Sequence, residues 1–142
     1  MSVIFSRACE YAIRGLVEMA RDTERHTWRV HELAKMTNTP APFLAKTFQA
    51  LIKAEILNSQ KGRKGGFFFA KEPDTISLLE VVEAIDGNEI TRACALGFPS
   101  CTSENPCAIH TNWEPVRNKL LDLLSNKTIS ELTLFFPTDA LL

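Results

Sequence analysis

Apolar residues near the start of the chain recur at the spacing of an α-helix. A helix is predicted over residues 5–21, because apolar positions there follow one another at intervals of four and three and so share one face. That face consists of Phe5, Cys9, Ile13, Leu16 and Ala20. A second helix is expected over 30–36, and the turn formers at 37–40 end it.

A third helix is predicted over residues 40–54. Its two early prolines are tolerated because first-turn amides have no intrahelical acceptor to lose. The apolar face is formed by Leu44, Phe48, Leu51 and Ile52. The outward positions are Lys46, Gln49 and Lys53. Two short helices joined by a tight turn, the second with polar groups outward, predict a helix-turn-helix whose outward residues contact DNA.

The next segment predicts a β-hairpin. Two strands, over 56–60 and 67–70, flank the glycine-rich turn 61–66. A hairpin directly after a helix-turn-helix is a wing, here spanning 56–70. Its basic residues Lys61, Arg63 and Lys64 are placed to reach phosphates or the narrow minor groove. A phosphate-binding loop is not favoured, because no Gly-Lys-Ser/Thr opens a helix after the glycines.

The second half of the chain predicts three more helical segments. A capping box at 77–80 starts a helix that runs to 86, where a glycine follows. A second capping box, at 128–131, starts a short helix through 135. Between them lies a long helical pattern in which Pro115 either kinks the helix or falls in the first turn of a helix that starts near Asn112.

Apolar residues of this long helix are spaced four, three, four and three apart. They are Ile109, Trp113, Val116, Leu120 and Leu123. The spacing is that of a coiled-coil seam, which predicts pairing with the same helix of a second chain. Packing of this seam against its own domain is the alternative.

Composition bounds the class of protein. The chain has 142 residues, of which 45% are hydrophobic, enough for one domain with a core and an oligomerisation element. No apolar run of transmembrane length occurs, and the start lacks the pattern of a secretory signal. We therefore expect a cytoplasmic protein that is not attached to a membrane, in which cysteines favour metal or redox chemistry over disulfides.

Charge is distributed unevenly along the chain. The formal net charge is only −1. Residues 46–71, however, contain six basic side chains and one acidic one, a net charge of +5, whereas the rest of the chain carries −6. A basic segment that coincides with a helix-turn-helix and a wing is the footprint expected of a phosphate-binding surface.

Three cysteines fall within fourteen residues of a loop-forming stretch. Cys94, Cys101 and Cys107 are separated by gaps of six and five residues, and His110 follows three residues later. Their placement between turn-forming residues favours thiolates collected for a metal or an iron–sulfur cluster, with a nitrogen or oxygen ligand completing the site. No Cys-x2-Cys pair typical of zinc sites occurs. Cys9, on the first helix, is expected to be a small buried residue.

In this order, these features resemble the IscR/NsrR family of bacterial winged-helix regulators. The resemblance is carried by EYAIR at 10–14, FLAK at 43–46, KGRKGGF at 61–67 and the three-cysteine loop before a long helix. It implies a mainly α fold with a small β-hairpin wing. It also implies a winged helix-turn-helix DNA-binding domain over 1–86, a cysteine-rich sensor loop over 87–108, and a dimerisation helix with a C-terminal helix over 109–142.

The resemblance further implies a homodimeric transcription factor with an iron–sulfur cluster. His110 stands where IscR-like members that hold a 2Fe–2S cluster have a histidine, so 2Fe–2S is favoured over 4Fe–4S. Other members take a carboxylate from the first helix of the partner, which leaves Glu10 or Cys9 of the partner subunit as alternative fourth ligands. Pro42 and Ala45 depart from the polar residues usual on the recognition helix, and Arg63 and Lys64 from the usual proline and glycine at the wing tip.

The function expected from these observations is a repressor. Two recognition helices would enter successive major grooves of a roughly palindromic operator in double-stranded DNA, and the state of the cluster would control binding. The alternative is a regulator of the same fold without a cofactor, in which the cysteines act as direct redox thiols. No nucleophile–base or paired-carboxylate arrangement is visible, so an enzyme is not expected.

Overall fold

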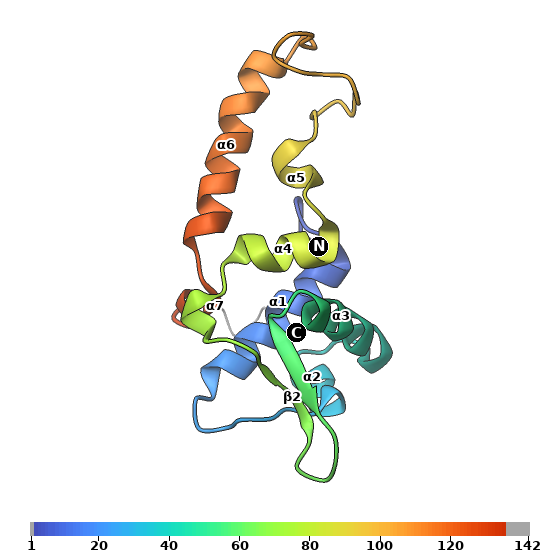
Figure 1. The fold of residues 1–142 in the computed structure, drawn as a ribbon, viewed down its shortest axis with the longest axis vertical. Helices are drawn as coiled ribbons and strands as arrows, with labels where there is room; N and C mark the ends of the chain where they lie inside the picture. The colour runs from blue at the N-terminus through green and yellow to red at the C-terminus, as the bar shows by residue number, and fades with distance from the viewer. Residues whose placement is uncertain (1, 136–142) are drawn as a thin grey trace.

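Helix α1 (Arg7–Arg21) lies at the centre of the molecule (Figure 1). The computed structural model describes residues 2–135. Four helices pack against α1: α2 (Val30–Met36), α3 (Ala41–Lys53), α4 (Leu78–Asp86) and α7 (Ile129–Leu132). The other elements are strands β1 (Leu57–Gln60) and β2 (Gly66–Phe69), the 3₁₀ turn η1 (Pro73–Thr75), and helices α5 (Glu89–Arg92) and α6 (His110–Asn126). The predicted fold class, mainly α with a β-hairpin wing, is confirmed.

The core joins α1, α3 and the wing. Phe48 of α3 is fully buried. It lies against α1 at Gly15, where an added Cβ would sit only 2.8 Å from its Cζ atom, so the glycine permits this close approach. On the wing side, Phe67 meets the Phe48 ring edge to face at a centroid distance of 5.1 Å. Burial of such aromatic rings contributes a large share of core stability.

The start of α1 is connected to the end of α4. Ser6 is the N-cap, and its Oγ accepts a hydrogen bond of 3.1 Å from the amide of Cys9. The helix therefore begins two residues later than predicted, and Phe5 precedes it. The Ser6 amide in turn donates to Oδ2 of Asp86 at 3.0 Å, which ties the last residue of α4 to the first turn of α1.

From α2 to α4, each predicted helix and strand is found within one residue at each boundary. Helix α2 has the expected bounds, and α3 has Pro40 as its N-cap instead of its first residue. Strands β1 and β2 are antiparallel, with Leu57 paired to Phe69. The capping box of Ser77 is present in full. These elements were predictable because their patterns are local.

The region between α4 and α6 contains a helix that was not predicted. Gly87 ends α4 with φ of 78°, and the four-residue helix α5 follows inside the stretch expected to be loop. A helix of this length has too few apolar positions for a periodic pattern. Residues 93–109 form the loop proper, at the end of the molecule farthest from the wing (Figure 1).

Helix α6 begins at His110, so the expectation that Pro115 lies in the first turn of a helix starting near Asn112 is wrong. The proline is the sixth residue of the helix, in its second turn, and not in a first turn starting near Asn112. It removes one amide donor, yet the helix runs on to Asn126. Leu124 near its end and Ile129 of α7 are fully buried, which returns the chain to the core.

The last predicted helix is shorter than expected. Thr128 caps it, accepting from the amide of Glu131, but α7 ends at Leu132 and not at residue 135. Met1 and residues 136–142, which the predicted segments 1–86 and 109–142 include, lie outside the described residues.

Candidate functional site

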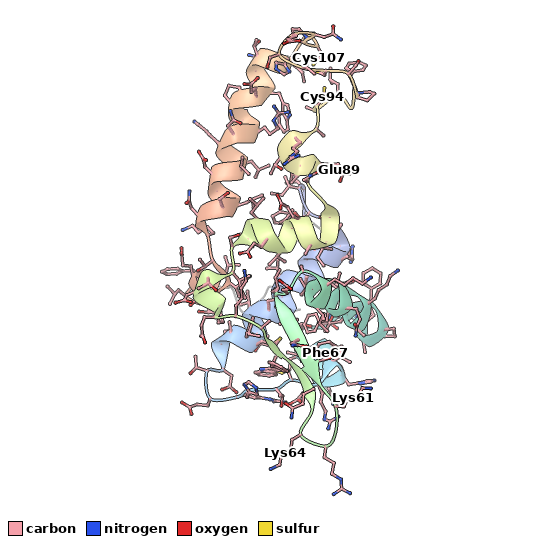
Figure 2. All side chains as sticks on the ribbon, viewed as in Figure 1. Lys61, Lys64, Phe67, Glu89, Cys94 and Cys107 are labelled. Atoms are coloured by element: carbon pink, nitrogen blue, oxygen red, sulfur yellow. The ribbon has the colours of Figure 1, made fainter. Side chains whose placement is uncertain are left out.

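The predicted DNA-contacting side chains are exposed, and Gln49 of α3 and Lys61 of the wing line the same shallow pocket. Lys46, Gln49 and Lys53 of α3 are exposed, opposite the buried face of that helix. Lys61, Arg63 and Lys64 are exposed in the turn between β1 and β2. Figure 2 shows Lys61 and Lys64 at this end of the molecule, far from Cys94 and Cys107. Exposed cations on a helix and a wing are the side chains that a phosphate-binding surface requires.

The wing is braced by a segment that the sequence did not reveal. Trp28 pairs with Phe67 in a two-residue antiparallel bridge, with both amides donating, at 2.8 and 2.7 Å. Beside this bridge, the Arg29 guanidinium donates to the carbonyl oxygens of Gly62, at 3.2 Å, and Arg63. The hydroxyl of Thr27 donates to the carbonyl of Lys64 at 3.1 Å.

These three residues before α2 therefore orient the wing turn. A single bridge has no alternating pattern, which is why sequence reasoning missed it. The close approach is possible because Gly66, with φ of 144°, has no Cβ, and an added one would lie 2.4 Å from the Trp28 carbonyl oxygen.

The three loop cysteines come together at the opposite end. The Sγ atoms of Cys94, Cys101 and Cys107 all lie within 4.8 Å of one another. The Sγ atoms of Cys94 and Cys107 are 3.7 Å apart. The amide of Cys107 points to Sγ of Cys101 at 3.4 Å. All three residues are half-buried, so the sulfur atoms are screened by the loop but remain accessible.

The pKa values of two of these thiols are shifted in opposite directions. The amide of Phe98, then that of Leu96, and hydrogen bonds from Cys107 and Cys101 lower the pKa of Cys94 to about 7. The thiol of Cys101 also receives a backbone hydrogen bond, from Cys107. Desolvation and the two neighbouring sulfurs outweigh it and raise the Cys101 pKa above its usual range. Of these two thiols, Cys94 is therefore the one that ionises more readily near neutral pH.

His110 lies against the thiols at the first residue of α6. Its Nδ1 atom is 3.4 Å from Sγ of Cys101, and the residue is only 8% exposed. Its Nε2 atom is 2.8 Å from Oε2 of Glu114, one turn along the helix, but the two are not aligned for a hydrogen bond. A ligand histidine characteristically gives its second nitrogen to a carboxylate. Glu114 was not singled out from the sequence, although its i, i+4 spacing from His110 was visible.

The alternative fourth ligands lie on α1. Cys9 is fully buried, as expected for a small core residue. Burial, followed by the charges of Asp86 and Glu10, raises its pKa to about 12. Its thiol is therefore protonated and enclosed. Glu10 is half-buried, and its Oε1 accepts from the amide of Ser2.

The predicted seam of α6 divides between two faces. Val116 and Leu123 are 53% and 52% exposed, and Ile109 is 37% exposed. Leu120 instead packs against the core. Trp113 turns toward α5, and its indole N–H donates to the carbonyl of Ala93 at 3.1 Å. Three of the five predicted residues are thus exposed, while the other two are half-buried and contact their own chain.

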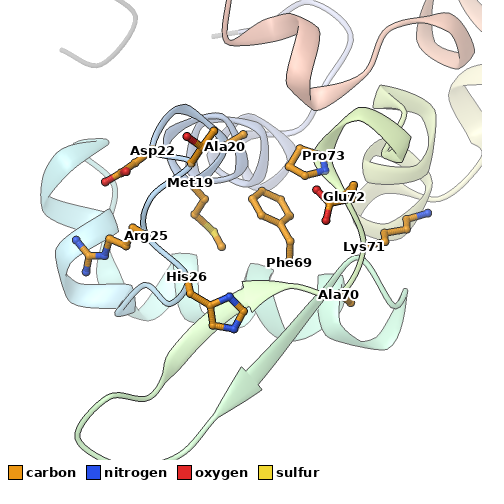
Figure 3. A pocket seen from close by; sticks show the side chains of 11 residues that line it. Met19, Ala20, Asp22, Arg25, His26, Phe69, Ala70, Lys71, Glu72 and Pro73 are labelled. Carbon is orange, nitrogen blue, oxygen red and sulfur yellow. The ribbon is translucent and has the colours of Figure 1, made fainter.

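A pocket of about 310 Å³ lies between the end of α1 and strand β2 (Figure 3). Arg25 and Lys71 lie on its wall, but each already has a partner. Arg25 pairs with Glu32, and Lys71 with Glu80. Both cations of the pocket wall are therefore engaged within the protein.

One protein-family model matches nearly all of this amino-acid sequence. The Rrf2 family, described as "Iron-dependent Transcriptional regulator", matches residues 5–134. The chain belongs to the Rrf2 family. This membership confirms the resemblance stated above and shows a DNA-binding transcriptional regulator, not an enzyme.

Individual Rrf2-type relatives agree. A protein of Aquifex aeolicus, provisionally named an HTH-type transcriptional regulator, is 35% identical over 132 residues, 92% of this chain and 91% of that protein. The regulator IscR of Escherichia coli is 25% identical over 122 residues, 86% of this chain and 75% of IscR.

Solved structures share the fold. CymR of B. subtilis, titled the global cysteine regulator of that organism, superimposes with a TM-score of 0.81 at 18% identity, covering 96% of this chain and all of CymR. IscR of T. potens gives a TM-score of 0.69 at 19% identity, covering 93% and 85%. Within the part of the chain that the structure describes, no helix has the length and apolarity to cross a membrane.

Proposed function

We propose that this Rrf2 protein is a repressor whose binding to operator DNA is controlled by an iron–sulfur cluster held by the loop. The observation that carries the proposal is the convergence of Cys94, Cys101 and Cys107, whose Sγ atoms lie within 4.8 Å of one another, with Nδ1 of His110 3.4 Å from Cys101. The three cysteines lie in the proposed sensor loop, residues 87–108, and His110 follows it.

The donor set suits such a group. Thiolates are the ligands that iron prefers in sulfide clusters, and a histidine completes some of these sites. Cys94, with its pKa near 7, is available as a thiolate without a strong base. When bound, the cluster would supply iron whose charge and ligation respond to oxidants, nitric oxide or iron supply. Three thiolates and one histidine favour the 2Fe–2S form.

His110 is the best-placed fourth ligand. It belongs to the same loop end, and Glu114 lies 2.8 Å from its second nitrogen, where it can orient the ring. Cys9 is less suitable, since its thiol is enclosed in the core and its pKa is about 12. Glu10 of the partner subunit remains the alternative that a homodimer would permit.

The loop is well placed to influence DNA binding. It connects α5 to α6, and α5 follows α4, whose Asp86 is hydrogen-bonded to the start of α1. We infer a homodimer paired through the exposed residues Val116 and Leu123 of α6 and Ile109, the N-cap of that helix. In such a dimer, a shift of α6 would change the separation of the two recognition helices from the roughly 34–36 Å needed to enter successive major grooves of a palindromic operator. Control requires the two cluster states to differ in DNA affinity.

A second function has one observation in its favour. Because the Sγ atoms of Cys94 and Cys107 are 3.7 Å apart, the same loop could act as a cluster-free thiol switch. Both proposals use the basic surface in the same way, and they differ in whether iron and sulfide are bound.

The deciding experiment is iron and acid-labile sulfide analysis with an absorption spectrum on protein purified without air. Bound iron and sulfide with a charge-transfer spectrum support the cluster, and absence of both favours the thiol switch. Cys94→Ala should abolish iron binding, whereas the matched Cys9→Ala variant should retain it. Equal affinity of the loaded and cluster-free forms for the same operator would refute control by the cluster.

A further inference from the structure

Helix α6 holds both ends of the cysteine loop. At the end that enters α6, the amide of His110 donates to the carbonyl of Cys107 at 3.2 Å. At the other end, side chains of α6 reach the carbonyls where the chain leaves α5. One helix therefore frames the loop that brings the sulfur atoms together.

Two residues make the contacts at the α5 end. The indole N–H of Trp113 donates to the carbonyl of Ala93 at 3.1 Å. The Arg117 guanidinium donates to the carbonyl of Arg92 at 2.9 Å and to that of Ala93 at 3.3 Å. Carbonyls at a helix C-terminus lack intrahelical donors and carry partial negative charge, so a cation and an N–H group satisfy them well.

These contacts lie next to the reactive thiol. Ala93 is bonded directly to Cys94, the residue whose sulfur lies 3.7 Å from Sγ of Cys107. Trp113 and Arg117 follow His110 at spacings of three and then four, so they continue the helical face that approaches the thiols. Fixing the Ala93 peptide limits the positions that the Cys94 side chain can take.

We propose that Trp113 and Arg117 are positioning residues for the sulfur site. Their hydrogen bonds to the end of α5 hold Cys94 beside Cys107 and connect the loop to the helix through which we propose the subunits pair. The proposal rests on the proposed function only where it concerns the iron–sulfur cluster. The position of Cys94 relative to Cys107 can be measured in protein that holds no cluster.

The first measurement uses cluster-free protein. In a Cys101→Ser background, Cys94 and Cys107 are the two loop thiols left to pair, and Cys9 is buried. Equilibration with glutathione reports their proximity: formation of one disulfide oxidises two thiols and converts one oxidised glutathione into two reduced ones. We expect Trp113→Phe, which keeps an aromatic side chain but loses the indole N–H, and Arg117→Ala each to lower this equilibrium constant roughly fivefold.

Matched variants separate positioning from a general effect on the helix. Lys119→Ala removes a cation from the same helix, at an exposed residue with no hydrogen bond or ion pair among the described residues, and should leave the constant unchanged. Arg117→Lys retains the charge with a less suitable donor geometry and should give an intermediate value. Far-UV circular dichroism melts identify any variant that has lost its fold. If an Arg117 variant does not fold, the disulfide equilibrium constant of Trp113→Phe alone tests the positioning role.

The second measurement uses the cluster-loaded protein with all its cysteines. We expect Trp113→Phe and Arg117→Ala to lose iron to a chelator several times faster than Lys119→Ala. If the parent holds no iron and the glutathione constants still shift, the proposed cluster is wrong and the positioning role stands. The positioning role itself would be overturned if Trp113→Phe and Arg117→Ala had the same disulfide equilibrium constant as Lys119→Ala. It would also be overturned if the Cys101→Ser protein formed no Cys94–Cys107 disulfide.

Discussion

The two ends of this molecule are held together by different means. The DNA-binding end surrounds a packed core in which Leu16, Leu44 and Phe48 are fully buried. At the sensor end, Leu96 and Phe98 are 53% and 54% exposed, and the loop is fixed by hydrogen bonds to α6 and by the proximity of its thiols. Apolar burial maintains the first region whatever is bound, whereas the second can respond to a change at its sulfur atoms.

The largest expected difference between the two ends is in thiol reactivity. At pH 7 and without a cluster, Cys94, with its pKa near 7, should be alkylated by iodoacetamide at least about a hundredfold faster than Cys9, with its pKa near 12. Because the thiolate reacts, labelling of Cys94 should slow as the pH falls below 7. Peptide mass spectrometry measures both sites in one sample, and denatured protein, where the difference should vanish, is the control.

The next expected effect concerns the core. Phe48→Ala should lower the free energy of unfolding by about 3–5 kcal/mol, since it removes a fully buried ring between α1 and the wing. Phe98→Ala removes the same side chain from the exposed loop and should cost less than about 0.5 kcal/mol in the cluster-free protein. Urea unfolding measures both variants. Similar costs would contradict the division into a packed end and a responsive end.

The wing cations should determine much of the salt dependence of DNA binding. Lys61→Ala together with Arg63→Ala should reduce the slope of log K against log salt by nearly 2, because each phosphate contact contributes about 0.9. Fluorescence anisotropy with one operator at several salt concentrations gives the slope. Lys119→Ala, which removes one exposed cation of α6 outside the proposed DNA-binding surface, is the control and should leave the slope unchanged. An unchanged slope in the double variant would remove the wing from the DNA interface.

The smallest expected effect tests the brace behind the wing. Arg29→Ala should weaken operator binding by roughly threefold to tenfold, because the Gly62 and Arg63 carbonyls lose their donor and the wing turn is less well ordered. Since Arg29 acts through the wing, the salt slope should change less than it does for Lys61→Ala. If Arg29→Ala changed the salt slope by as much as the loss of one phosphate contact does, Arg29 would instead touch DNA directly.

Much of the fold was accessible from local patterns. The bounds of α2, the wing strands and the capped start of α4 were each predicted within one residue, because periodicity and capping depend on near neighbours in the sequence. Helix α5 was not, since four residues are too few for a pattern. The position of Pro115 in a second turn was not predicted, because a proline beyond the first turn removes an amide donor and usually ends or kinks a helix.

The sequence by itself determined the chemistry available to this protein: a basic helix and wing, three cysteines and a histidine within one short stretch, and membership of a family of regulators. Only the tertiary structure decided how those groups are used. It placed the indole N–H of Trp113 against the carbonyl of Ala93, set Arg29 behind the wing, and enclosed Cys9 in the core. The reason is physical, since residue spacing specifies which helix face a side chain occupies, but the element that meets that face depends on how the whole chain packs.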